Sequence, residues 1–315
     1  MTKTPNKIFW VLIFLMGARL GFAGSPSANR FALVNSYSLA IFSCGCSLGG
    51  GLGGLERFAP LTDDLVKKKG SIKMMFAGDT FAVVDNFPPE SSVIEFQNIT
   101  LKLINSFKDS IYAPSAWDLT KLAPADLQRI KKASKFKWVA SNISPKVDKM
   151  WEESLPVTVG SESLTLYSLV SDAVGDVKAR YTVIPPEKYL REVVLPQAQK
   201  SKRPIMVILT NDMEPLPALK EISKEAGLLV FEAHGNSNEG IRYREDRTLQ
   251  IGARTKGRQI TELELDALPK PFVSFRPPAL ELVKGSVYSV DKSLERPSAF
   301  TKILKKLKKE FVQIE

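Results

Sequence analysis

The sequence of 315 residues is poorest in histidine and cysteine: it has a single histidine, His234, and two cysteines, Cys44 and Cys46. Imidazole and thiolate are the side chains on which many catalytic and transition-metal sites depend. One histidine excludes any metal centre built mainly from histidines. Two cysteines allow at most one disulfide bridge within the chain. The sequence also has no internal repeat and no long low-complexity segment, which argues against solenoid and fibrous architectures.

The composition is that of an ordinary globular protein, with 44% hydrophobic and 25% charged residues. Basic residues outnumber acidic ones, so the formal net charge is +10. Such a charge suits an acidic partner, a membrane surface or a phosphate-bearing small molecule, although a basic solvated surface explains it equally well. Aromatic and basic residues are not interleaved, and we therefore expect no nucleic-acid partner.

The N-terminus has the pattern of a secretory signal. Lys3 and Lys7 precede an apolar run over residues 8–16, and small residues follow up to Ala23. We expect residues 1–23 to be a signal peptide and the mature protein to be periplasmic or secreted. An uncleaved membrane anchor is the alternative, although the run is short for a span.

Hydrophobic periodicity predicts alternating strands and helices. The expected strands are Ser36–Ser43, Ser71–Asp79, residues 136–143, Arg203–Asp212 and residues 227–233, with two short strands joined at Gly160. The expected helices are Leu55–Lys69, Ser91–Phe107, Pro124–Lys135 and Pro217–Ala226. A further β segment over residues 248–266 has a turn near Lys256 and Gly257. Polar loops follow Ser43, Ala77, Leu209 and Phe231, and these loops should converge because sites assemble at the carboxyl ends of strands in α/β sheets.

The C-terminal residues 276–315 are predicted to form a linker and a basic amphipathic helix with Phe300, Ile303, Leu307 and Phe311 on its apolar side. This helix either docks on the preceding domain or contacts a membrane surface or a partner protein.

A glycine run raises the question of nucleotide binding. Gly49, Gly51 and Gly54 satisfy G-x-G-x-x-G between an expected strand and an expected helix, and Asp79 ends the next strand, which is formally the dinucleotide-binding arrangement. The secretory signal and the two cysteines at the tight turn argue against a dinucleotide oxidoreductase. The same glycines also let a backbone pass close to a site and leave helix N-terminal amides free for an anion.

A series of motifs carries a resemblance to a known family. In chain order they are "GLGGLERFAPLTDDLVKKK", "MMFAGDT", "FKWVASNIS", "VTVGSESLTLYSLVSD", "IMVILTND", "LLVFEAHGNS" and "LQIGARTKGRQITELELD". From about Ser36 to Asp266 the sequence resembles the N-terminal domain of periplasmic 5'-nucleotidases, in the calcineurin-like metallophosphoesterase superfamily. The resemblance implies an α/β fold, a four-layer α/β/β/α sandwich within residues 24–275, and a two-metal phosphoesterase site at the strand ends.

The resemblance also places the family's site on residues of this chain. The family's first ligand motif, D-x-H, falls on Cys44 and Cys46, and the bridging aspartate is kept as Asp79. In the family's "GNHEFD" loop the ligand asparagine becomes Pro114 and the catalytic histidine becomes Ser115. Of the later ligands, one histidine becomes Asn211, one is kept as His234, and one becomes Asn236.

These replacements imply an eroded metal site that holds at most one divalent ion, zinc or manganese. We therefore expect a phosphoesterase-like protein that is weakly active or inactive. The alternative is a non-catalytic protein that binds a ligand or partner and carries a Cys-x-Cys metal or redox element. Cys44 and Cys46 either join Asp79 and His234 around a metal, form a strained disulfide bridge, or are small residues in a tight turn.

Overall fold

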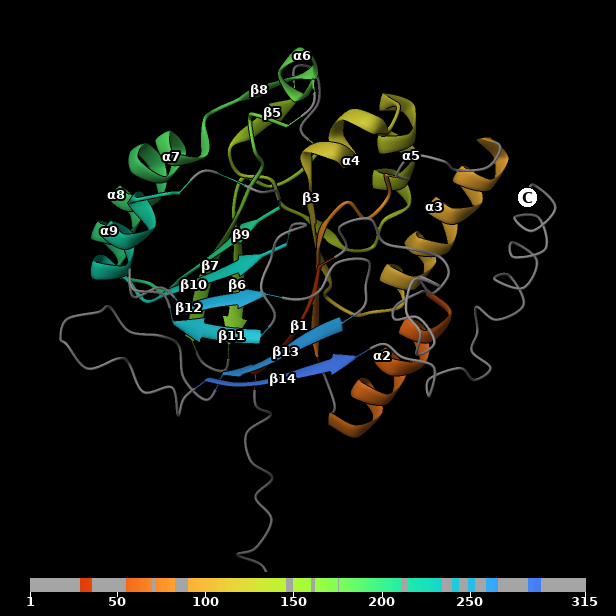
Figure 1. Ribbon diagram of the computed structural model, residues 1–315, viewed down its shortest axis with the longest axis horizontal. Helices are drawn as coiled ribbons and strands as arrows, with labels where there is room; N and C mark the ends of the chain where they lie inside the picture. The colour runs from red at the N-terminus through yellow and green to blue at the C-terminus, as the bar shows by residue number, and fades with distance from the viewer. Residues whose placement is uncertain are drawn as a thin grey trace, which may run out of the picture.

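The protein is an α/β structure with two six-stranded sheets (Figure 1). The computed structural model describes residues 29–35, 55–69, 72–82, 90–145, 150–159, 162–174, 176–210, 213, 215–233, 240–243, 249–252, 259–265 and 283–289. The predicted α/β class is confirmed.

The first sheet has the strand order β14-β13-β1-β2-β3-β4. Its strands are β1 (Asn29–Asn35), β2 (Lys73–Gly78), β3 (Ile111–Pro114), β4 (Lys137–Trp138), β13 (Gln259–Leu265) and β14 (Val283–Ser289). Strands β1 to β4 run parallel, whereas β13 and β14 add antiparallel partners beyond β1.

The second sheet has the order β11-β12-β10-β9-β7-β6. Its strands are β6 (Leu155–Val159), β7 (Glu162–Leu169), β9 (Ile205–Leu209), β10 (Leu228–Glu232), β11 (Gly240–Tyr243) and β12 (Leu249–Gly252). The four inner strands are parallel, and β6 and β11 form antiparallel edges. A separate small sheet pairs β5 (Ile143–Pro145) with β8 (Tyr181–Val183).

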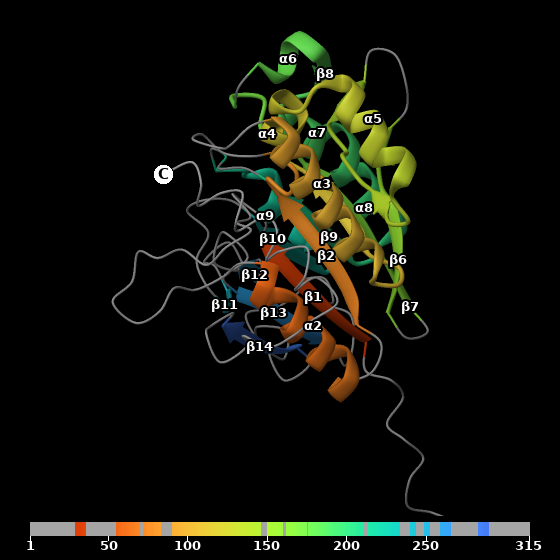
Figure 2. The same ribbon diagram turned by 90° about the vertical axis from the view of Figure 1, so that its right-hand side faces the viewer.

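Helices lie on opposite sides of the two sheets. Figures 1 and 2 show α2, α3 and α5 on one side of the molecule and α7, α8 and α9 on the other. The first group comprises α2 (Leu55–Lys69), α3 (Glu90–Asn105), α4 (Ala116–Lys121) and α5 (Pro124–Ala133). The second comprises α7 (Pro186–Tyr189), a π-helical turn η1 (Leu190–Val194), α8 (Leu195–Ser201) and α9 (Ala218–Glu225), and the short α6 (Val177–Arg180) precedes β8. None of the described helices is long and apolar enough to cross a membrane.

Alternating side chains of the strands build three apolar clusters. On β2, Met74 and Phe76 pack in the cluster beneath α2 to α5, whereas Met75 and Ala77 face a cluster shared with the second sheet. On β9, Met206 belongs to that shared cluster and Val207 to the cluster beneath α7 to α9. Both faces of these strands are therefore buried, which is why their sequences are continuous apolar runs rather than alternating ones.

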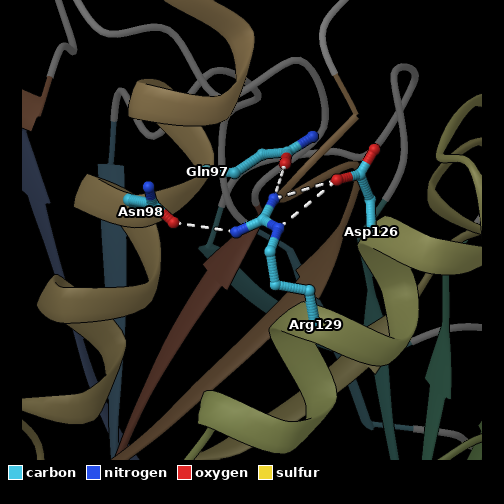
Figure 3. Close-up of polar contacts among 4 residues, drawn as sticks. All are labelled: Gln97, Asn98, Asp126 and Arg129. Carbon is cyan, nitrogen blue, oxygen red and sulfur yellow. Dashed lines mark hydrogen bonds and ion pairs between the residues drawn. The ribbon is translucent and has the colours of Figure 1, made fainter. Parts of the chain in front are cut away.

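Arg129 ties α5 to α3 (Figure 3). Its guanidinium group donates to Oδ1 of Asn98 at 2.8 Å and to Oε1 of Gln97, and it lies 3.1 Å from Oδ1 of Asp126. The planar guanidinium can serve these three acceptors at once because its N–H groups form a rigid fork. Gln97 is 1% exposed, so this contact reaches into the covered side of α3.

The first strand is not where the sequence pattern indicated. Two similar apolar runs follow each other, "FALV" and "LAIF", and the prediction used the second. The strand that pairs in parallel with β2 is Asn29–Asn35, with Asn35 opposite Ala77. The expected strand Ser36–Ser43 lies outside the described residues, whereas the predicted parallel strand–helix–strand unit is present with an earlier first strand.

The predicted β segment over 248–266 contains two strands, β12 and β13, which do not pair with each other: β12 belongs to the second sheet and β13 to the first. The prediction for the residues that follow is wrong. Residues 283–289, expected within a linker, form β14, which pairs with β13 along its whole length. The expected strand over 136–143 is short as well, since β4 ends at Trp138.

Candidate functional site at the carboxyl edge

The described part of the site lies where β2 and β3 end side by side. Gly78 and Pro114 are opposite each other in the parallel register, so Asp79 and Ser115 are the next residues on neighbouring strands. Gly78 has a φ of 99°, a conformation that glycine adopts without steric cost, and the chain turns there immediately before Asp79. The hydroxyl of Ser115 donates a hydrogen bond to Oδ1 of Asp79. Both side chains are buried, with Asp79 2% and Ser115 0% exposed.

Ser115 also begins α4. Its Oγ accepts a hydrogen bond from the backbone N–H of Asp118 at 3.1 Å, which is the ordinary bond of a serine N-cap. One hydroxyl therefore donates to the loop after β2 and accepts from the first turn of α4. This double role fixes the position of Asp79 relative to the helix.

Asp118 anchors the loop that follows Asp79. Its carboxyl oxygens accept backbone N–H groups of Thr80 and Phe81, both at 2.9 Å, and of Ala82 at 2.5 Å. The hydroxyl of Tyr112 donates to Oδ2 of the same carboxyl group, the oxygen that also accepts from Thr80. Asp118 is 0% exposed. It therefore positions the loop and does not meet a ligand in solvent.

Burial is the largest cause of the pKa shifts of Asp118 and Tyr112. Desolvation raises the pKa of Asp118 to about 6, although the hydrogen bonds from Tyr112 and from the loop amides oppose the shift. The pKa of the Tyr112 hydroxyl lies well above its ordinary value, first because it is buried and second because Asp118 is beside it. Tyr112 is thus a neutral donor at physiological pH.

The carboxyl edges of the two sheets meet after β4 and β7. Backbone N–H of Ser141 donates to Ser168 O at 2.7 Å, and Ser141 Oγ accepts from Ser168 N–H at 2.8 Å. The Asn142 amide accepts from Val170 N–H and donates to Val170 O and Ile184 O, each at 2.8 Å. These bonds join the segment that follows β4 directly to the end of β7 in the second sheet.

Three strands of the second sheet end together. Thr210 donates to Leu169 O through both its N–H, at 3.2 Å, and its Oγ1, at 2.9 Å, and Ala233 N–H donates to Leu209 O at 2.8 Å. The polar segments after Ala77, Leu209 and Phe231 therefore follow parallel strands, as the sequence predicted. The fourth predicted loop, after Ser43, lies outside the described residues.

Of the candidate metal ligands, only Asp79 is among the described residues. The other candidates fall outside them: Cys44, Cys46, Asn211, His234 and Asn236. Asn211 directly follows Thr210 in the chain, and His234 directly follows Ala233, so both succeed parallel strands. Within the described ranges no group of three histidine, cysteine, aspartate or glutamate side chains is arranged to hold a metal ion.

The placement of the first ligand motif on Cys44 and Cys46 stays a prediction, because both cysteines lie outside the described residues. It depended on a strand over Ser36–Ser43, but the observed strand ends at Asn35. The residues that directly follow the strand in the chain are therefore Ser36, Tyr37 and Ser38, and Cys44 comes later in the chain. The metal or redox role of the cysteines stays a prediction.

Comparison with known proteins identifies the fold. No protein-family model and no curated protein sequence matches the chain. Among solved structures, a Staphylococcus aureus protein assigned as a 5'-nucleotidase superposes with a TM-score of 0.66 at 14% identity, covering 90% of this chain and 58% of its own. A 5'-nucleotidase precursor of Thermus thermophilus gives a TM-score of 0.60 at 14% identity, with 91% and 58% covered.

A calcineurin-like phosphoesterase of Bacillus subtilis, YfkN, gives a TM-score of 0.57 at 11% identity, covering 91% of this chain and 98% of that one. The chain therefore has the fold of calcineurin-like metallophosphoesterases. More particularly, it is similar in fold to 5'-nucleotidases, as the resemblance predicted. It spans 58% of the length of the two nucleotidase structures.

Proposed function

We propose that this chain is an exported protein of the 5'-nucleotidase type whose phosphoesterase site is eroded, so that hydrolysis is weak or absent. The fold supports the phosphoesterase part of this proposal. Export is supported by the basic residues and the apolar run at the N-terminus, and the Thermus thermophilus protein of similar fold is itself described as a precursor.

The observation that carries the proposal is the pairing of Ser115 with Asp79. By resemblance, Ser115 stands where the family has its catalytic histidine. A serine hydroxyl does not ionise near neutral pH and so cannot replace histidine as a general acid, whose loss typically costs about 10² to 10⁴ in rate. The Ser115 hydroxyl is, moreover, committed to Asp79 and to the N-terminus of α4.

Metal binding is proposed at no more than one divalent ion, zinc or manganese. A two-metal mechanism needs several protein ligands for each ion, and by resemblance four of the family's ligand positions carry Cys44, Cys46, Asn211 and Asn236 instead. If an ion is held, Asp79 and His234 would be its retained ligands, joined by Asn211, Asn236 or the two cysteines. Such an ion would polarise a phosphate oxygen.

The direct experiment combines metal analysis with hydrolysis of p-nitrophenyl phosphate and a nucleoside monophosphate, with and without added Mn²⁺ or Zn²⁺. We expect less than two tightly bound ions per chain and little or no turnover. Asp79→Asn should remove any residual metal, whereas the control Asp176→Asn, at an exposed position before α6, should not. Two tightly bound ions per chain, together with rapid hydrolysis, would overturn the proposal.

A second candidate function is ligand binding without chemistry. It is favoured by the intact support of the loop after β2: Asp118 still holds three consecutive backbone amides of that loop in place. Calorimetric titration with inorganic phosphate and a nucleoside monophosphate separates the candidates. Saturable binding without turnover supports the binding protein, and slow turnover supports the eroded enzyme.

A further inference from the structure

A group of lysines gathers at the opposite end of the first sheet from Asp79 and Ser115. We name it the amino-edge lysine surface, and it consists of Lys102, Lys108, Lys132, Lys135 and Lys137. All five side chains are exposed. Lys108 precedes β3 and Lys137 begins β4, whereas Ser115 follows the end of β3. Four residues of β3 at about 3.3 Å each put roughly 13 Å of strand between the two ends.

The segments that carry these lysines are bonded to each other, so the surface is continuous. The Asn105 amide donates to Ala133 O at 2.9 Å and accepts from Lys135 N–H at 2.7 Å. Lys137 N–H donates to Ser110 O at 3.1 Å. The end of α3, the end of α5 and the starts of β3 and β4 therefore form one face.

The charge of this face is unbalanced. None of the five lysines forms an ion pair with another described residue. By contrast, Lys188 on α7 pairs with Glu192, and Lys202 directly after α8 pairs with Glu225. Helix C-termini favour cations, which accounts for Lys102 and Lys132 near the ends of α3 and α5. It does not account for Lys108, Lys135 and Lys137, which lie outside the helices.

The chemistry of the face favours an anionic membrane over nucleic acid. Among the described rings nearby, Phe136 is 5% and Trp138 1% exposed. The partly buried Phe107 packs against Phe76 in the apolar cluster, so none of these rings is free to stack on a base. The guanidinium group of the neighbouring Arg129 is already bonded to Gln97, Asn98 and Asp126 (Figure 3). It is therefore not available for a bidentate contact with a phosphate. Compact ammonium charges without an exposed apolar anchor suit adsorption to anionic lipid headgroups.

We propose that the amino-edge lysine surface adsorbs to an anionic lipid bilayer. In this orientation the carboxyl edge, with Asp79 and Ser115, points away from the membrane toward the aqueous phase. Binding is electrostatic and reversible, and it does not depend on whether the carboxyl edge hydrolyses phosphate esters.

The test uses the full chain and sedimentation with vesicles of phosphatidylcholine, either pure or mixed with phosphatidylglycerol. The triple variant Lys108→Gln, Lys132→Gln, Lys135→Gln is compared with a control of equal charge change on the other side of the molecule. The control is Lys200→Gln, Lys220→Gln, Lys224→Gln, whose lysines are likewise exposed and outside ion pairs. Each lysine near an anionic surface strengthens binding by about fivefold.

We expect the first variant to bind mixed vesicles at least about tenfold more weakly than the wild type, and the control to bind nearly as well as the wild type. Binding should disappear as salt is raised from about 0.01 M to about 1 M, because the Debye length falls from about 30 Å to about 3 Å. On vesicles, acetylation by a soluble reagent should be suppressed at Lys132 and Lys135 but not at Lys220.

Equal losses in the two variants would show a response to net charge alone and would overturn the proposal. So would unchanged binding of the first variant, which would assign adsorption to the basic residues near the C-terminus, present in every sample. Loss of single-stranded RNA binding by the first variant, with vesicle binding unchanged, would identify a nucleic-acid surface instead.

Discussion

Ser115 and Asp79 are joined by a hydrogen bond between a hydroxyl and a carboxyl group that are both buried at the carboxyl edge of the first sheet. The two residues belong to neighbouring strands and lie 36 positions apart. The bond locks the loop after β2 to the start of α4. It thereby links the local stability of this edge of the sheet to the side chain of Ser115.

Replacing Ser115 with alanine should destabilise the protein by about 1 to 3 kcal/mol, because the change removes an N-cap and a donor to a buried carboxyl group. Urea denaturation measures the loss. Ser106→Ala, at an exposed serine that bonds only its own turn, is the control and should cost less than about 0.5 kcal/mol. Equal losses in the two variants would mean that the bond to Asp79 contributes nothing measurable.

The free energy of unfolding should fall as pH rises from about 4 to about 6, because Asp118 loses a proton in this range. Its pKa is about 6 in the folded protein and about 3.9 when unfolded, so the folded state binds the extra proton. The stabilisation that this proton gives the folded state is fully present below pH 4 and is lost as pH rises through 6. It amounts to about 3 kcal/mol in the free energy of unfolding. Denaturation at several pH values, compared with Asp118→Asn, isolates this contribution as the difference between the two curves.

Tyr112→Phe should shift the pH range over which Asp118 titrates in the folded protein. Removing the hydroxyl deletes a hydrogen bond that lowers the pKa of Asp118, so the pH window should move upward. Parallel pH curves for wild type, Asp118→Asn and Tyr112→Phe would contradict the assignment of the titrating group.

Asn142→Asp should be severely destabilising, by about 3 kcal/mol or more at neutral pH. The amide N–H groups donate to two backbone carbonyls, and a carboxylate would present oxygen to oxygen there. Protonation should recover part of the loss at acidic pH. Asn98→Asp is the matched control, since Asn98 only accepts from Arg129 and a carboxylate accepts equally well. Thermal unfolding that ranks the control below Asn142→Asp in stability would be inconsistent with these roles.

Arg129→Lys should cost about 1 kcal/mol although the positive charge is kept. A lysine cannot reach Gln97, Asn98 and Asp126 together, and the buried Gln97 amide loses its donor. Arg191→Lys, in an exposed pair with Glu187 and Glu221, should change stability by less than about 0.5 kcal/mol. Chemical denaturation of both variants gives the comparison, and a larger loss at Arg191 would refute the special role of Arg129.

Local patterns were sufficient for much of the fold. Helix α5 was predicted because Pro124 suits a first helical position and Leu127 and Ile130 share one face. Strands β2, β9 and β10 were predicted because strands buried on both faces are short continuous apolar runs. The elements α6 to α8, by contrast, were not predicted, although Leu190, Val194 and Ala198 recur at helical spacing and are buried. Prolines at 185, 186 and 196 interrupt that stretch of sequence.

Nonlocal pairing was not readable from the sequence. Nothing local distinguishes "FALV" from "LAIF" as the strand beside β2, and nothing near Gly257 shows that the chain passes from one sheet to the other. Asp79 could be selected because it ends a buried strand. The bonds from Ser115 and to Asp118 depend on the register of β2 and β3, which only the folded structure provides.

Strand β1 lies between β2 and β13, with Phe31 opposite both Lys73 and Leu263. During synthesis, which starts at the N-terminus, one edge of β1 therefore stays unpaired until nearly all of the described sequence has been made. Pairing between such distant segments is slow to form, and an unpaired strand edge is prone to associate with other chains. Strands β13 and β14 thus complete the first sheet late in synthesis, and a chain that ends before residue 259 should aggregate rather than fold.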